Sequence, residues 1–342
     1  MNLLDLPIDI LYHIFSFIPL KYELLNICQL FNDIFYERSK YIIYNKNIDI
    51  NIFKKLKNLH YIFYYIPKEE ENNSQLFSII PSSNKLYKLV LLFNNTNITK
   101  NVLDFIKNIN ITDLTIVLYV DNINVVWNNI SPELFGKSLK NIVKLRLELD
   151  RVVPVKYIDV FITEFSKHNH NLVEFITDNA NLWKLITHFS STLKSIELLL
   201  RTHNGYSYGA YKQNETPFFI AINNCIYLEN VILSIPFTSI TKLLLLTNLS
   251  NLKKININIS RNIPPNDIVV CRYVEKIFIK DLKNLNHRIN QLLHKIIWPQ
   301  LLEFEFHSAY KSISQNFIIS FLLKDCRSNL KHLEIPQYMV NN

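Results

Sequence analysis

Three pairs of side chains have the residue types that catalysis or metal binding uses. These are His168/His170, His287/His294 and Glu303/Glu305. Imidazoles can bind a metal ion or transfer a proton, and paired carboxylates can divide acid and base roles. A working site also needs further ligands or an orienting group, and neither histidine pair has such a companion nearby in the sequence. The two glutamates alternate with apolar residues, so we expect them on the polar face of a strand, in contact with water.

Sequence motifs of the common enzyme classes are missing as well. The chain has no G-x-S-x-G, no phosphate-binding P-loop and no H-E-x-x-H. Its four cysteines stand far apart in apolar surroundings without a C-x-x-C pair, namely Cys28, Cys225, Cys271 and Cys326. This spacing favours buried, reduced thiols over a zinc site. We therefore predict that the chain is not an enzyme, with no catalytic residue, no metal and no cofactor.

The formal net charge of +8 is spread along the chain, and no basic run is longer than pairs such as Lys54-Lys55 and Lys253-Lys254. A nucleic-acid groove concentrates basic residues on one surface, so nucleic-acid binding is only the weakest alternative, one that strong salt dependence would reveal. The apolar N-terminus is interrupted by Asp5, Asp9 and His13. No segment reaches the ~18 uncharged apolar residues that a membrane span needs, and no signal peptide is recognisable. We expect a protein without membrane contact.

Residues 3–36 predict short amphipathic helices. Asp5 can cap a helix whose first turn contains Pro7, and apolar residues then recur at helical spacing until Pro19. A second apolar helix follows from Leu24 towards Phe31. So short a segment cannot bury all of these side chains internally. Its apolar face must therefore pack on the rest of the chain or on a partner.

The run L-P-x-D-I-L-x-x-I-F-S-F-I-P, followed by L-L-x-I-C-x-x-F, resembles the F-box. The resemblance implies docking on a Skp-type adaptor, and through it on a cullin–RING ubiquitin ligase. The segment between Ile18 and Phe31 is about two residues shorter than the usual family spacing, which leaves the contacts of the second helix less defined. The expected adaptor-binding residues are Leu6, Pro7, Ile10, Leu11, Ile14, Phe15, Ile18, Pro19, Leu24, Leu25, Cys28 and Phe31.

The remainder of the chain repeats the pattern apolar-x-x-apolar-x-apolar eleven times. The ten intervals between first positions range from 21 to 35 residues, with a mean of about 27. Each copy ends in the alternation of a half-buried strand, and segments of helical length lie between copies. These include 180–189, 217–225, 238–247, 284–297, 314–326, a stripe from Val102 to Ile109 and a segment at Val160–Phe165. The first positions are Leu59, Leu86, Ile111, Ile142, Leu172, Leu193, Leu228, Leu252, Val274, Leu301 and Leu330.

One strand and one helix per 20–30 residues resembles the leucine-rich repeat. This resemblance implies an α/β solenoid with a parallel sheet on its concave side and helices outside. The family places Asn or Cys three residues after the last strand anchor, where its side chain bonds the backbone of the turn. Asn94 fits, whereas Ala180, Pro236 and most other copies do not. We expect the turns to satisfy their backbone groups in another way and the repeat to be irregular. The alternative is an ordinary doubly wound α/β domain.

These patterns divide the chain into an F-box-like helical domain at 1–40, a linker at 41–56 and a solenoid of about eleven repeats at 57–342. A target protein should contact the solvent side of the strands, and basic residues there suggest an acidic patch on it. The insertion at 202–216 is either a recognition loop or a tolerated surface insertion. The expected target-binding residues are Lys88, Lys144, Arg146, Tyr206, Tyr208, Tyr211, Lys254 and Lys331.

Taken together, the sequence predicts a substrate-recognition adaptor of an SCF-type ubiquitin ligase, monomeric outside the ligase complex. The alternative is a protein-binding solenoid scaffold without a ligase role, in which the N-terminal apolar face packs on its own chain. Because the thiols are expected to be reduced and no signal peptide or membrane span is recognisable, we expect the cytoplasm or nucleus. The composition is typical of AT-rich codons, as in a protist or a large DNA virus, and for a virus the compartment would be that of the host cell.

Overall fold

The computed structural model describes residues 6–7, 10, 41–44, 59–66, 86–94, 100–109, 111–119, 132–149, 155–199, 216–233, 246, 249–259, 269–270, 272–281, 296–297, 299–308 and 329–334. The chain divides into two compact units, Met1–Asn171 and Leu172–Asn342. Among the described residues, no helix combines the length and apolarity that crossing a bilayer requires.

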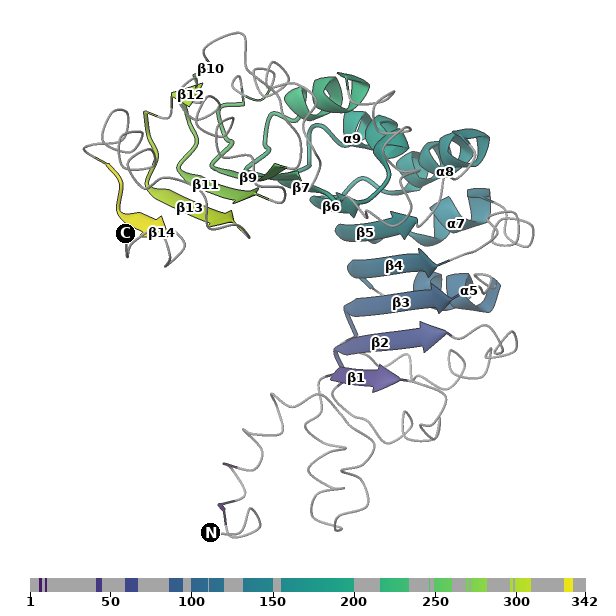
Figure 1. Cartoon of the computed structure of the whole chain (residues 1–342). Helices are drawn as coiled ribbons and strands as arrows, with labels where there is room; N and C mark the ends of the chain where they lie inside the picture. The colour runs from purple at the N-terminus through teal and green to yellow at the C-terminus, as the bar shows by residue number, and fades with distance from the viewer. Residues whose placement is uncertain are drawn as a thin grey trace. The chain divides into compact units, whose positions relative to one another are not determined.

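Unit 1 is a parallel sheet in which described helices alternate with the strands from β3 onward (Figure 1). The strands pair in chain order, and α5, α7 and α8 lie together on one side of them. In chain order the elements are β1 (Tyr41–Tyr44), β2 (Tyr61–Ile66), β3 (Lys88–Asn94), α5 (Lys100–Asn108), β4 (Asp113–Tyr119), α7 (Pro132–Ser138), β5 (Lys144–Leu149) and α8 (Val155–His168).

In unit 2 described helices alternate with strands as far as β8. Its main sheet is parallel in the order β6-β7-β8-β9-β11-β13-β14, and β10 pairs with β12 in a separate parallel ribbon. A helix over 216–223 precedes β8. The other elements are β6 (Glu174–Thr177), η3 (Ala180–Leu182), α9 (Trp183–His188), β7 (Ser195–Leu198), β8 (Asn230–Leu233), β9 (Lys254–Ile259), β10 (Val269–Val270), β11 (Lys276–Asp281), β12 (Ile296–Ile297), β13 (Glu303–Ser308) and β14 (His332–Glu334).

The predicted apolar triplets fall in register across neighbouring strands. In unit 1 their middle residues Ile62, Leu89, Leu114 and Leu145 pair in sequence. In unit 2 the same position runs from Phe175 through successive strands to Leu333. All of these residues are buried except Leu333, on the last strand. Each unit is therefore a leucine-rich-repeat-like solenoid, in which one repeat covers the apolar face of the next.

A recurring backbone contact fixes this register at the start of each strand. The carbonyl oxygen that follows the first anchor accepts two consecutive N–H groups from the next repeat. His60 accepts from Tyr87 at 3.1 Å and Lys88 at 3.2 Å, and Lys253 accepts from Glu275 and Lys276 at 2.9 Å each. The contact satisfies backbone groups that would otherwise have no hydrogen-bond partner at the point where the chain enters the strand.

The helices bury the faces that the sequence indicated, with one exception. Val102, Phe105, Ile106 and Ile109 are buried along α5 and the turn after it, as predicted. On α8, Phe161 and Phe165 are buried, but Val160 is 37% exposed. The buried stripe consists of Ile158, Phe161, Ile162 and Phe165, which have the i, i+3, i+4, i+7 spacing of one helix face, and Val160 falls outside that spacing.

Several predicted boundaries differ from the observed elements. β1 lies within 41–56, the segment predicted as a linker, and pairs with β2 in parallel. β12 occupies the end of the predicted helix 284–297, where the β-branched pair Ile296-Ile297 extends the ribbon with β10. Helices are confirmed within 180–189 and 217–225, and α7 was not predicted. The predicted helices 238–247 and 314–326 lie outside the described residues, apart from Leu246.

Asparagine side chains satisfy turn carbonyls in both units, although not at the position that the family pattern uses. Asn169 donates to the Ile142 oxygen at 2.7 Å, within unit 1. In unit 2, Asn251 donates to the Ile226 oxygen at 2.7 Å and Asn329 to the Pro299 oxygen at 3.3 Å. All three precede the first anchor of a repeat and bond the turn of the repeat before it. In these repeats an asparagine just before the strand therefore caps the turn of the preceding repeat.

Candidate functional site

The polar side of each sheet is defined by the strand positions that alternate with the buried anchors. We call this side the open face. Its side chains form columns across neighbouring strands, because the strands are in register. In unit 1 one such column contains Tyr61, Lys88, Asp113 and Lys144. Each repeat therefore adds a side chain to the same surface.

Lys88 is the centre of the polar contacts on the open face of unit 1. Its Nζ lies 3.2 Å from Asp113 Oδ2 on the next strand and 5.4 Å from the ring centroid of Tyr61 on the previous one. Burial raises the pKa of the Tyr61 hydroxyl, and the neighbouring Lys88 partly opposes this shift. Lys88 is half-exposed, so it can contact a partner while it links three strands.

Arg146, another predicted target-binding residue, pairs through its Nε with Oε1 of Glu148 on the same strand face. The Glu148 side chain is 1% exposed, although it stands on the open face. Its cross-strand partner Val117 is also buried. The guanidinium thus compensates a carboxylate that has lost its contact with water, and Arg146 acts first as an internal counter-ion. Lys144, two residues earlier on the same face of the strand, is exposed.

On the open face of unit 2, the corresponding strand position is occupied by Lys254, Lys276, Glu303 and His332. Lys276 Nζ donates to Glu303 Oε1 at 2.6 Å. This hydrogen bond lowers the pKa of the Glu303 carboxyl, and the charges of Lys276, His332 and Lys254 act in the same direction. Lys254 is exposed, as is Lys331, which precedes β14.

Beyond the column of Lys276, Glu303 and His332, the open face of β11, β13 and β14 brings aromatic and acidic side chains together. The rings of Phe278 and His307 have centroids 4.9 Å apart. Glu305 and Glu334 are direct register partners on neighbouring strands. His307 Nε2 lies 3.5 Å from Glu334 Oε1, so a diagonal contact joins the two strands. Glu334 is 29 residues from Glu305 in the chain, and nothing in the local sequence of either residue indicates that they meet.

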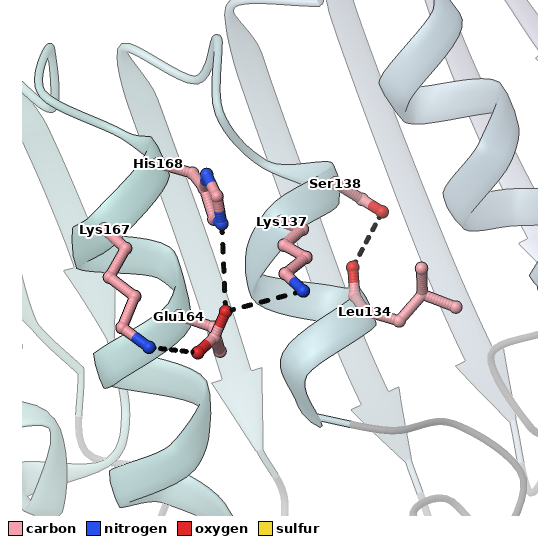
Figure 2. Close-up of polar contacts among 6 residues, drawn as sticks. All are labelled: Leu134, Lys137, Ser138, Glu164, Lys167 and His168. Carbon is pink, nitrogen blue, oxygen red and sulfur yellow. Dashed lines mark hydrogen bonds and ion pairs between the residues drawn. The ribbon is translucent and has the colours of Figure 1, made fainter.

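The His-Asn-His segment singled out in the sequence is the end of a helix. His168 Nε2 lies 3.8 Å from Glu164 Oε2, while Asn169 is buried against backbone groups and His170 is exposed. Glu164 also contacts Lys137 and accepts a hydrogen bond from Lys167 at 2.6 Å (Figure 2). That hydrogen bond lowers the pKa of the Glu164 carboxyl, with smaller effects of the same sign from the nearby cations.

Most predicted adaptor-binding residues lie outside the described residues. Of those described, Leu6 is half-buried, Pro7 is exposed and Ile10 is 46% exposed. The N–H of Ile10 donates to the Pro7 oxygen at 2.9 Å. The residues that the structure does not describe are Leu11, Ile14, Phe15, Ile18, Pro19, Leu24, Leu25, Cys28 and Phe31, together with the predicted target-binding residues Tyr206, Tyr208 and Tyr211.

No protein-family model matches the chain, and no curated protein matches it. Among solved structures, the chain is similar to one from the Toll–Spatzle complex of Drosophila, with 10% identity and a TM-score of 0.40 over 86% of this chain and 43% of the other. It is also similar to the plant peptide hormone receptor RGFR1 in complex with RGF2, with 13% identity and a TM-score of 0.29 over 80% and 47% of the two chains. The chain thus spans less than half the length of either.

Proposed function

We propose that the chain is a protein-binding scaffold whose partner lies along the open face. The observation that carries this proposal is the registered column of charged and polar side chains on successive strands of each unit. Stacked repeats present such a column as one extended surface. A ligand that contacts several repeats gains affinity from each, without a deep pocket. In this proposal the chain performs no chemistry itself.

The chemistry of unit 2 favours a partner with acidic and apolar groups. Lys254 and Lys276 are exposed on neighbouring strands, and the half-buried Phe278 lies two residues after Lys276 on the same face of β11. Cations at the rim accelerate association with an acidic surface, while an aromatic side chain contributes apolar contact area. An acidic partner segment with an apolar residue near the centre of the contact would fit these groups.

A charge reversal on one face tests the scaffold proposal. The full chain and the variant Lys254→Glu/Lys276→Glu would be used for quantitative affinity capture from cell extract. The matched control Lys107→Glu/Lys140→Glu changes the net charge equally at exposed positions of α5 and the turn after α7. We expect at least one bound protein to fall tenfold or more with the open-face variant and to be unchanged with the control. If both variants retain every bound protein equally, the open face is not the binding surface.

We also propose, as a finer hypothesis, that the N-terminus docks on a Skp-type adaptor, so that the solenoid acts as a substrate receptor of a cullin–RING ubiquitin ligase. The F-box-like sequence supports this, and two of its described residues, Pro7 and Ile10, are exposed and available for contact. The solenoid would hold target lysines at a fixed distance from the ubiquitin-charged enzyme. Such a role places the chain in the cytoplasm or nucleus.

Direct binding to a purified Skp-type adaptor tests this second proposal. The intact chain would be compared with Leu6→Ala/Pro7→Ala, and with Ile226→Ala as a control for an exposed apolar residue elsewhere. Retention by the intact chain and the control, with loss in the N-terminal variant, is the expected result. Absence of retention by all three would remove the ligase role and leave the scaffold proposal standing.

A further inference from the structure

Four side chains with metal-binding groups gather on the open face of the last two described strands of unit 2. Glu305 and His307 stand two residues apart on β13, and His332 and Glu334 stand two residues apart on β14. The register pairs Glu305 with Glu334 directly. Alternation along each strand places all four on the same face, opposite the buried side chains of Phe304 and Phe306.

The distances among these groups are close to those of a bound metal site. One ligand atom from each of Glu305, His307 and Glu334 lies within 4.8 Å of the other two. His307 Nε2 is 3.5 Å from Glu334 Oε1, and His332 Nε2 is 3.9 Å from Glu334 Oε2. Ligand atoms around tetrahedral zinc, bonded at about 2.0–2.1 Å, lie about 3.3 Å apart. Side-chain shifts of roughly 1.5 Å or less would therefore bring the ligand atoms of Glu305, His307 and Glu334 around one ion.

The charges of the cluster also call for a cation. Like charges directly opposite each other on neighbouring strands destabilise a sheet, and Glu305 and Glu334 stand in that arrangement. Lys276, on the adjacent strand β11, pairs instead with Glu303 at 2.6 Å. Within the part of the chain that the structure describes, the ion-pair partners of Glu334 are the two histidines. An imidazole can be a neutral metal ligand, so both histidines can join the carboxylates in holding one ion.

We propose that Glu305, His307 and Glu334, with His332 as a fourth ligand, form a binding site for a divalent transition-metal ion of the zinc type. Mixed imidazole and carboxylate ligands suit Zn²⁺ better than Mg²⁺ or Ca²⁺, which prefer oxygen ligands alone. The ring of Phe278 packs 4.9 Å from that of His307 and orients the imidazole. This inference replaces the sequence-based expectation that the acidic pair on this strand only contacts water. It does not depend on the proposed function.

The site also has a structural consequence. Leu333, on β14, is 43% exposed, so β14 buries less apolar surface than the strands before it. A metal ion bridging β13 and β14 would fasten this strand to the rest of the sheet. Metal binding to the folded form alone stabilises a protein in proportion to the logarithm of the ligand concentration. Zinc should therefore protect β14 from local opening more than it protects the other strands.

Zinc titration of the full chain tests the proposal. Metal-free protein would be titrated with ZnCl2 by isothermal calorimetry, for the intact chain and the variants His307→Ala and Glu334→Gln. His188→Ala, at an exposed histidine near the end of α9, is the matched control. We expect the affinity to fall tenfold or more in both cluster variants and to be unchanged in the control. Circular dichroism would show that each variant remains folded.

A second measurement separates this site from zinc bound elsewhere on the chain. Amide hydrogen exchange with and without Zn²⁺ should slow over β13 and β14 in the intact chain, and the slowing should be absent in His307→Ala. The proposal is overturned if the intact chain does not bind Zn²⁺ at a free concentration of about 100 micromolar, because the Kd would then be weaker than about 100 micromolar. It is equally overturned if binding persists unchanged in both cluster variants, or if zinc protects other strands and not β14.

Discussion

The side-chain amide of Asn169 donates a hydrogen bond to the backbone oxygen of Ile142 at 2.7 Å. The same nitrogen donates to the Leu139 oxygen at 2.9 Å, and the amide oxygen accepts the N–H of Asn171 at 2.9 Å. Asn169 is fully buried. One side chain therefore satisfies three backbone groups, and it holds the turn after α8 against the turn after α7.

Replacing Asn169 by alanine should destabilise unit 1. The Ile142 oxygen would lose its Asn169 donor, the Leu139 oxygen would keep only the N–H of Ile142, and the Asn171 N–H would lose its acceptor, at a total cost of roughly 2–4 kcal/mol. Urea unfolding followed by circular dichroism measures this change. Asn171→Ala is the matched control, because the Asn171 side chain is exposed and only its backbone N–H is bonded. The control should stay within about 0.5 kcal/mol of the parent, and similar losses in both variants would contradict the assigned role.

Gly136 marks the closest approach of α7 to α8. A Cβ added there would lie 2.6 Å from the backbone nitrogen of Phe165 and 2.8 Å from Glu164 Cβ. Alanine normally favours a helix over glycine by up to about 1 kcal/mol. Here we expect Gly136→Ala to destabilise by about 2 kcal/mol, because the two helices must separate. Thermal unfolding gives the sign directly, with Lys140→Ala as a control at an exposed position in the turn after α7, and a stabilised variant would show that the helices are not packed this closely.

Arg146 and Glu148 should behave as a coupled pair. Arg146→Met removes the ion pair between the guanidinium and the buried Glu148 carboxylate and should cost about 3 kcal/mol of unfolding free energy. The double variant Arg146→Met/Glu148→Met removes both charges and should recover most of that loss. A double-mutant cycle from denaturant unfolding measures the coupling. If the losses measured for Arg146→Met and for Glu148→Met add up to the loss of the double variant, the pair makes no specific contribution.

The ion pairs of Glu164 predict a dependence of stability on acidity. The hydrogen bond from Lys167 holds the pKa of the Glu164 carboxyl below its ordinary value of 4.5. Folding therefore favours the ionised form, and this stabilisation is complete well above pH 4.5. It is lost as the pH falls through the lower folded-state pKa. Unfolding free energies measured between pH 7 and acid should fall less steeply in Glu164→Gln and in Lys167→Met than in the parent, and an unchanged slope in both would contradict the pairing.

The thiol of Cys225 should be unreactive while the chain is folded. It is buried, and burial raises its pKa to about 12. Because only the thiolate is nucleophilic, about one molecule in ten thousand is reactive at pH 8. Alkylation followed by peptide mass spectrometry should label Cys225 only after denaturant is added. Rapid labelling of the native chain would show that this repeat opens readily.

The repeat was predictable from the amino-acid sequence. Apolar residues at the strand positions from Leu59 to Leu330 recur because each repeat must bury the same face against its neighbour, and that requirement is local to each copy. The triplets consequently fall in register, and the buried stripe of α5 was predictable for the same reason. Elements without a strong period were less predictable, as β1 in a predicted linker and the unpredicted α7 show.

Which polar side chains meet depends on how the strands and helices pack in the folded chain. The burial of Glu148 depends on the strands beside it, and the contact between Asn169 and Ile142 spans 27 residues. Glu305 and Glu334 come together because β14 pairs with β13 in one particular register. Such contacts depend on the lengths and paths of the connecting segments. A single repeat does not encode those paths, so its sequence indicates a strand but not the neighbours of that strand's polar face.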